Sequence, residues 1–173
     1  MQNYTFDIKK VLTVACKLEV PSDAASEIDA TLKALALACN YIHKIVPITF
    51  TSSDRIKSRS YQAVKEEFGL SPSLAICAID RVAENRQIAQ RSGSIVKEFK
   101  PTSAEYNVGI FSFREEDMTV SISLLDGQQR FKVLIGKHQL NLLKGQQLQS
   151  ATLLKRQNSY YIHLHWEVIW RPG

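Results

Sequence analysis

The first part of the chain shows a two-residue alternation of apolar and polar side chains. In residues 8–20, IKKVLTVACKLEV, apolar side chains occupy every second position from Leu12 onward. Successive side chains of a β-strand point to opposite faces, so this pattern predicts a strand with one buried face. A lone strand would leave its backbone groups unpaired, and we therefore expect it to join strands from later in the chain. The predicted buried positions are Leu12, Val14, Cys16, Leu18 and Val20.

The apolar period then changes to that of a helix. Between Pro21 and Pro47, apolar side chains recur every three or four residues, which predicts one long amphipathic helix. Ser22 is its expected N-cap, and Pro47 ends it. The next segment, ITFTSSDRIKSRS (residues 48–60), is polar and basic, and we expect a loop or a short extended piece there.

Two further helices are predicted before residue 94. The segment SYQAVKEEFG, residues 60–69, is typical of a short helix closed by a C-terminal glycine. A longer helix is predicted for residues 72–92, because Ser71 and the proline after it form a helix start and Gly93 forms a stop.

Residues 94–173 return to a β pattern. Short β-branched and aromatic segments are separated by turn residues, and hairpins are expected around Asp126-Gly127 and Asn158-Ser159. Several short strands at intervals of about ten residues favour a small barrel or sandwich. The expected strands are IVKEF, NVGIFSF, MTVSISLL, RFKVLI, SATLLKR and YYIHLHWEVIW.

The order of these elements predicts an α+β fold, a small β-barrel with a three-helix insertion after its first strand. The expected boundaries are residues 1–20 for the first barrel strand, 21–93 for the helical insertion and 94–173 for the rest of the barrel. The chain of 173 residues is long enough for one domain of this kind or for two modules that share a core.

Charge and hydropathy narrow the classes of function. The net charge is +5, and it divides into zero for residues 1–50, +3 for residues 51–100 and +2 for residues 101–173. Such an excess favours nucleic acid through counterion release, although a mildly basic, solvated surface gives the same count. No apolar stretch is long enough to cross a bilayer, and the first residues do not resemble a signal peptide. We therefore expect a cytoplasmic protein without membrane contact.

No pattern of a catalytic or cofactor site is present. The sequence contains no P-loop, no dinucleotide-binding glycine pattern, and neither a GxSxG nor an HExxH motif. Cys16, Cys39 and Cys77 are far apart in apolar surroundings, which indicates buried side chains rather than metal ligands or a disulfide. We expect no cofactor and no metal.

One group of side chains does invite a metal hypothesis. His163, His165 and Glu167 project from one face of the last predicted strand, and two histidines with a carboxylate can bind a metal. On one strand, however, these side chains spread over about 13 Å, so they diverge rather than converge. We interpret them as a polar outer face of the sheet.

The whole pattern resembles the N-terminal part of the transposon-encoded TnpB (OrfB-type) proteins, relatives of the type V CRISPR effectors. The resemblance covers roughly residues 8–168 and rests on the order and spacing of several motifs. These are VLTVACKLEVPSDAASEIDATLKALALACNYI with its Cys39-Asn40-Tyr41 cluster, the helix GLSPSLAICAIDRVAENRQI, and the tail LLKGQQLQSATLLKRQNSYYIHLHWEV.

The resemblance implies a wedge-type, OB-like barrel with a helical recognition insertion. In that family these modules hold the structured part of a guide RNA, read a short motif beside the DNA target and cradle the guide–target duplex. Cleavage belongs to a RuvC-like nuclease domain, whose first catalytic Asp follows shortly after the last strand of this region.

This sequence departs from the family in two places. After Glu167 the chain reads VIWRPG, without that Asp and without the nuclease and its zinc-binding element, so we expect no DNA cleavage by this chain alone. A second chain would supply the RuvC-like half, or the chain is a truncated transposon product. The family also carries polar side chains in the middle of the helix at 72–91, where this sequence has Ile76 and Cys77, which cannot contact a base edge in bidentate fashion.

The candidate nucleic-acid contacts are basic side chains with nearby aromatic rings. For each of them, a solvated surface charge or a packed ring is the alternative interpretation. Basic side chains would contact phosphates, and the rings would stack on bases or sugars. The candidates are Arg55, Lys57, Arg59, Arg81, Arg86, Arg91, Lys155, Arg156, Tyr160, Tyr161 and His163.

The sequence thus leads to a main hypothesis and two alternatives. The main hypothesis is a non-catalytic nucleic-acid-binding module of TnpB type, with guide RNA, target DNA or both as partners. The first alternative is a protein-interaction module whose nucleic-acid surface has decayed, and it predicts that the basic groups do not converge on one face. An enzymatic alternative would require a metal at His163, His165 and Glu167.

Overall fold

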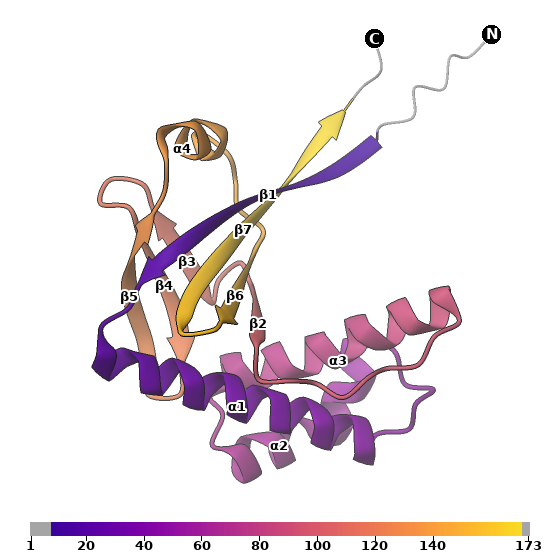
Figure 1. Cartoon of the computed structure of the whole chain (residues 1–173). Helices are drawn as coiled ribbons and strands as arrows, with labels where there is room; N and C mark the ends of the chain where they lie inside the picture. Colours follow the sequence, from indigo (N-terminus) through magenta and orange to yellow (C-terminus); the bar gives the residue numbers. More distant parts are fainter. Residues whose placement is uncertain (1–7, 171–173) are drawn as a thin grey trace, which may run out of the picture.

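The computed structural model describes residues 8–170, apart from the side chain of Trp170. Within these residues the chain forms an α+β fold of four helices and seven strands (Figure 1). Residues 1–7 and 171–173, which belong to the first and last predicted segments, lie outside the described residues. The elements are β1 (Ile8–Glu19), α1 (Ser22–Ile45), α2 (Ser53–Phe68), α3 (Pro72–Ser92), β2 (Ser103–Asn107), β3 (Phe111–Arg114), β4 (Thr119–Leu124), β5 (Gly127–Leu134), α4 (Lys137–Leu143), β6 (Ser150–Arg156) and β7 (Ser159–Trp170).

The strands form one curled antiparallel sheet in the order β2-β6-β7-β1-β5-β4-β3. The expectation that the first strand joins the later ones is confirmed, since β1 lies between β7 and β5. The curl brings strands that are distant in this order together. The hydroxyl of Tyr106 on β2 donates a hydrogen bond of 2.9 Å to the carbonyl oxygen of Ser123 on β4, across the interior of the sheet.

The loop predicted at 48–60 is wrong, because helix α2 begins at Ser53. Ser52 caps this helix by accepting a hydrogen bond of 3.3 Å from the backbone N–H of Arg55. Gly69 ends the helix in the left-handed conformation, as expected. The polar composition of the first turns concealed a helix whose buried positions are only Ile56, Ser60 and Val64.

The expected strand IVKEF is also wrong. Residues 94–100 form no strand, and the side chain of Asn40 on α1 fixes this connection at Phe99. The amide nitrogen of Asn40 donates a 3.0 Å hydrogen bond to the carbonyl oxygen of Phe99, and its amide oxygen accepts a 2.8 Å bond from the backbone N–H of Phe99. A side-chain amide thus takes the place of a neighbouring strand.

Helix α4, which the sequence pattern did not reveal, covers an edge of β1. Strand β5 pairs with β1 only over Lys17–Glu19. Immediately beyond this ladder, the side-chain amide of Gln139 on α4 donates a 3.1 Å hydrogen bond to the carbonyl oxygen of Ala15. The helix therefore satisfies a backbone group that a longer β5 would otherwise pair.

Helices α1, α2 and α3 lie against one end of the curled sheet (Figure 1), and one continuous hydrophobic core includes residues from both layers. Helix α1 is fixed to two hairpins by polar contacts. The hydroxyl of Thr31 accepts a 3.0 Å hydrogen bond from the backbone N–H of Leu125 in the β4–β5 turn, and the ammonium of Lys155 on β6 lies 2.8 Å from the carboxylate of Asp29. The three cysteines are buried and free, as predicted.

Candidate nucleic-acid interface

Successive side chains along β6 and β7 point to opposite faces of the sheet. The predicted C-terminal contacts therefore fall into two groups, one on each face. Tyr160 is 6% exposed, and its hydroxyl donates a 3.2 Å hydrogen bond to the carbonyl oxygen of Ala25 on α1. Lys155, paired with Tyr160 in the ladder, also points toward α1, where it forms the ion pair with Asp29. The prediction that Tyr160 stacks on a base is therefore wrong, since its ring is part of the core.

The other group lies on the outer face of the sheet. Tyr161 stands in register with Lys17 on β1 on one side and with Leu154 on β6 on the other. Its side chain is half-buried, while that of Lys17 is exposed. Arg156 has the same parity as Leu154 along β6, so it belongs to this face as well.

His163 lies on the same face, between Ala15 and Thr152. Burial lowers its pKa below the ordinary value of 6.5, and the positive charges of His165 and Arg156 lower it further. Thr152, which pairs with His163, and Arg156 are an even number of residues apart along β6, so Arg156 shares the sheet face of His163. Lys17, Arg156, Tyr161 and His163 therefore form a cationic and aromatic group on one open sheet face, which we call the sheet-face cluster.

His165 is fixed by two hydroxyl groups. Its Nδ1 lies 2.8 Å from the hydroxyl oxygen of Thr13, and its Nε2 lies 2.9 Å from that of Thr152. Burial lowers its pKa as well, so a neutral ring between a donor and an acceptor is favoured. Glu167 instead accepts a 3.1 Å hydrogen bond from Gln149. Within residues 8–170, no group of three or more histidine, cysteine or carboxylate side chains could hold a metal ion.

Helix α2 presents a second basic and aromatic surface. The ammonium groups of Lys57 and Lys65 lie 5.2 Å and 4.8 Å from the ring centroid of Tyr61, four residues from each. On another side of the helix, the guanidinium of Arg55 lies 3.9 Å from the ring centroid of Phe50, and that of Arg59 lies 5.5 Å from it. The sequence prediction of Arg55, Lys57 and Arg59 omitted Tyr61 and Lys65, although a helical spacing of four residues would have revealed both.

The arginines of helix α3 have separate roles. Arg81 donates hydrogen bonds of 2.6 Å and 3.1 Å to the carbonyl and hydroxyl oxygens of Ser103, and so ties α3 to the start of β2. The predicted phosphate contact of Arg86 is wrong, because the side chain is 2% exposed and bonded to backbone carbonyls. Arg91 is exposed near the end of the helix.

The basic groups do not converge on one surface. Lys155 meets helix α1 at Asp29, whereas Arg55 and Arg59 gather around Phe50, beyond the end of α1 at Ile45. Ile45 follows Asp29 by sixteen residues, which corresponds to about 24 Å of helix. The contacts of the hairpin and of the start of α2 are therefore well separated along α1.

The architecture defines an α+β protein whose curled antiparallel sheet carries the sheet-face cluster on its outer face. No known family model matches the sequence, and comparison with curated proteins finds no match. Among the helices of the described residues, none has both the length and the apolar character that crossing a bilayer requires.

Proposed function

We propose that this chain is a non-catalytic nucleic-acid-binding module, which binds guide RNA, target DNA or both as part of a TnpB-like RNA-guided system. The observation that carries the proposal is the sheet-face cluster, in which Lys17, Arg156, Tyr161 and His163 share one open face. Open sheet faces with rings and cations bind single-stranded nucleic acid, because rings stack on bases while cations contact the phosphates.

Each side chain of the sheet-face cluster would make a different kind of contact with the nucleic acid. Lys17 and Arg156 are basic side chains that would contact phosphate oxygens. Tyr161 offers a half-buried ring whose orientation the flanking strands restrict. His163, with its lowered pKa, is mostly neutral near pH 7 and can both donate and accept hydrogen bonds. Together they suit a polynucleotide more closely than they suit an isolated phosphate.

Helix α2 would provide a second contact for the same polynucleotide. Lys57, Tyr61 and Lys65 form a stripe at helical spacing, and Arg55 and Arg59 flank them. Because the sheet-face cluster and α2 are separate surfaces, only an RNA much longer than a single nucleotide would reach both. This requirement favours a folded or extended RNA over a mononucleotide.

The resemblance to the TnpB family supports the finer form of the proposal. The barrel would then be of the wedge, OB-like type, and residues 21–93 would be its recognition insertion. The motif Cys39-Asn40-Tyr41 fits this role through its contacts, because Asn40 binds the backbone of Phe99 and the ring of Tyr41 packs edge-on against Phe68, 5.5 Å between centroids. A separate RuvC-like chain would supply the nuclease.

One observation favours a second candidate function, a protein-interaction module. The basic groups lie on separate surfaces rather than on one, and apolar side chains are exposed at the helical end of the molecule. Ile48 is 65% exposed and Ile95 is 82% exposed, and both line one pocket beside α3. A partner protein on this pocket would leave the sheet-face cluster without a role.

An experiment that identifies bound RNA distinguishes the nucleic-acid function from the protein-interaction function. The tagged chain is recovered from its native host after ultraviolet crosslinking, and the attached RNA is sequenced. We expect enrichment of one structured RNA, with crosslinked peptides that contain Tyr161, and loss of this enrichment in the variant Lys17→Glu/Arg156→Glu. Recovery of no enriched RNA would refute the nucleic-acid function.

A further inference from the structure

The curled sheet has an open seam beside β3. In the described residues, β3 is the last strand of the sheet and forms its ladder with β4 alone. At one end the seam is closed, since Val108 forms an isolated bridge with Phe111. Alternate residues of an edge strand point their backbone N–H and C=O groups away from the partner strand, so β3 offers free hydrogen-bonding groups toward the seam.

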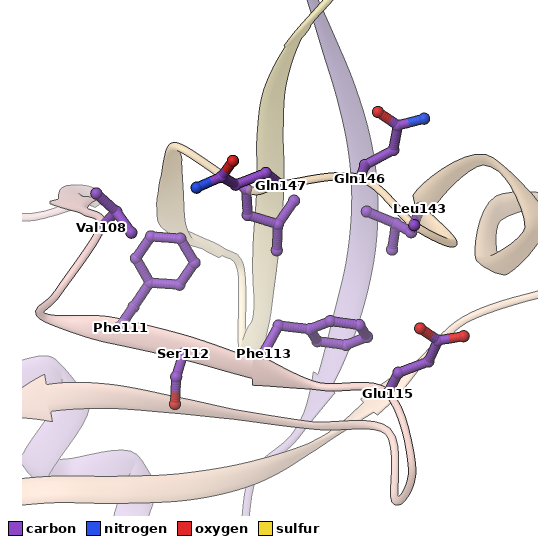
Figure 2. A pocket seen from close by; sticks show the side chains of 10 residues that line it. Val108, Phe111, Ser112, Phe113, Glu115, Leu143, Gln146 and Gln147 are labelled. Carbon is purple, nitrogen blue, oxygen red and sulfur yellow. The ribbon is translucent and has the colours of Figure 1, made fainter.

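A cavity of about 580 Å³ fills this seam, between β3 and residues 143–148 that lead from α4 into β6. The rings of Phe111 and Phe113 form one wall, and Leu143 lies across from them (Figure 2). Leu148 also lines the cavity. Phe111 and Leu143 are buried, whereas Phe113 and Leu148 are only partly covered. The cavity is therefore a groove whose apolar floor is part of the core, while Ser112, Gln146 and Gln147 add polar groups to its exposed rim.

One end of the groove is acidic. Glu115 lines the cavity directly after β3, and Glu116 follows it in the turn. Arg114 is occupied by its bidentate contact with Asp117, three residues further along. Among the described residues, neither glutamate forms an ion pair. In a chain with a net charge of +5, this groove thus ends beside two exposed glutamates.

We propose that the seam binds an extended segment of a partner protein by strand addition to β3. The segment would be four to five residues long, which matches the roughly 13 Å of β3 at about 3.3 Å per residue. An aliphatic side chain would lie between Phe113 and Leu148. A Lys or Arg at the end of the segment would meet Glu115 and Glu116. This proposal does not depend on nucleic-acid binding by the sheet-face cluster.

The chemistry of the groove selects this occupant over others. The two glutamates repel a phosphate backbone, so a nucleic acid is disfavoured here. The free backbone groups of β3 need partners that a small aromatic molecule cannot supply along the whole strand. A peptide backbone supplies them at each second residue, and its alternate side chains point into the apolar groove.

The probe for this site is a synthetic peptide of six residues, a lysine at one end followed by alternating threonine and valine. It is added to the full chain labelled with ¹⁵N, and backbone amide shifts are followed by NMR. Control peptides replace the lysine with glutamate or a central threonine with proline, which removes a backbone donor. We expect shifts confined to residues 111–116 and 143–148, backbone contacts between the peptide and β3, and weaker binding of both controls.

Two variants connect the binding to the proposed geometry. Phe113→Ser, which removes a partly exposed ring, is expected to weaken peptide binding about tenfold. Glu115→Lys is expected to reverse the preference for the lysine peptide over the glutamate peptide, about threefold in each direction. Val11→Ser, which removes an apolar side chain that is 64% exposed on β1, serves as the matched control and should leave both affinities unchanged.

The proposal is overturned if no peptide shifts the amides of β3, or if Glu115→Lys leaves the lysine preference as it was. It is also overturned if these amides respond to RNA or to an increase in the concentration of the chain itself, because a nucleic acid or a second copy would then be the occupant. Each variant is first compared with the wild-type chain by circular dichroism, and a folded Glu115→Lys protein suffices for the decisive comparison.

Discussion

Arg86 on helix α3 donates a hydrogen bond of 2.9 Å to the carbonyl oxygen of Val46, the residue that ends helix α1. The same guanidinium donates to the carbonyl oxygens of Pro47 and Phe50, at 2.8 Å and 2.9 Å. The C-terminal end of a helix carries partial negative charge, and a buried cation there compensates it. Burial lowers the pKa of Arg86, but the side chain remains a cation that holds α1, the 46–51 turn and α3 together.

The first prediction concerns the stability that Arg86 provides. Arg86→Met should lower the free energy of unfolding by about 2 to 4 kcal/mol, because several buried carbonyl groups lose their donor. Urea unfolding followed by circular dichroism measures the change. Arg91→Met, on the exposed end of the same helix, is the control and should change the stability by less than about 0.5 kcal/mol. Equal effects of the two substitutions would contradict the role of Arg86.

A second prediction follows from the contact between Asp29 and the β6–β7 hairpin. Burial acts to raise the pKa of Asp29, but hydrogen bonds from Lys155 and Tyr160 outweigh it and lower the pKa. A carboxyl whose pKa is lower in the folded state stabilises the fold above its unfolded pKa of about 3.9, and this contribution disappears as the pH falls through the folded value.

The melting temperatures of the wild-type chain and of Asp29→Asn should therefore differ most near pH 6. The difference should shrink steadily below pH 4, as Asp29 of the wild-type chain becomes protonated. A difference that is independent of pH would show that the ion pair with Lys155 does not stabilise the fold.

The third prediction uses His163 as a reporter of the sheet-face cluster. Its pKa is lowered by burial first and then by the charges of His165 and Arg156, so the ring should titrate below 6.5. Because the folded chain binds this proton less readily than the unfolded chain, the contribution of His163 to stability is present above pH 6.5 and decreases on acidification. In Arg156→Gln the pKa should rise toward its ordinary value. An NMR titration of the imidazole signals measures this pKa. If the pKa of His163 does not change in the variant, the charge of Arg156 does not act on His163.

The fourth prediction concerns the thiols. Burial raises the pKa of Cys16 to about 11 and that of Cys39 to about 12, and Cys77 behaves in the same way. Since the thiolate is the reactive form, all three should react with a thiol reagent at pH 8 only in denaturant. Rapid labelling of the native chain would mean that the core opens locally around one of them.

The sequence predicted the elements whose start, end and buried face depend on residues close together in the chain. The alternation in β1 indicated both its buried face and its need for partners, and the helix α3 matched its cap residues Ser71 and Gly93. Helix α2 was missed in its first turns because its apolar positions are sparse, and its stability depends on packing against α1 and α3. The segment before β2 was misread because its partner is the side chain of Asn40, far away in the sequence.

The candidate site also contains residues that the sequence could place and residues that only the structure could place. Odd and even positions of a strand point to opposite faces of the sheet, so Tyr161 and His163 lie on the face opposite to Tyr160. This assignment follows from the sequence once the strand is recognised. The burial of Arg86 could not be predicted, because it depends on the place where α1 ends relative to α3 in space. Lys17 entered the sheet-face cluster only through its register with Tyr161, which joins two strands from opposite ends of the chain.

The most direct test of the nucleic-acid function is the salt dependence of RNA binding. A fluorescently labelled structured RNA is titrated with the wild-type chain, with Lys17→Gln/Arg156→Gln, and with Lys33→Gln/Lys97→Gln, which removes the same charge elsewhere. We predict that the first variant binds at least about tenfold more weakly and that its slope of log affinity against log salt falls by about two, while the second resembles the wild type. Equal losses in the two variants, or no binding by the wild-type chain, would contradict the role of the sheet-face cluster.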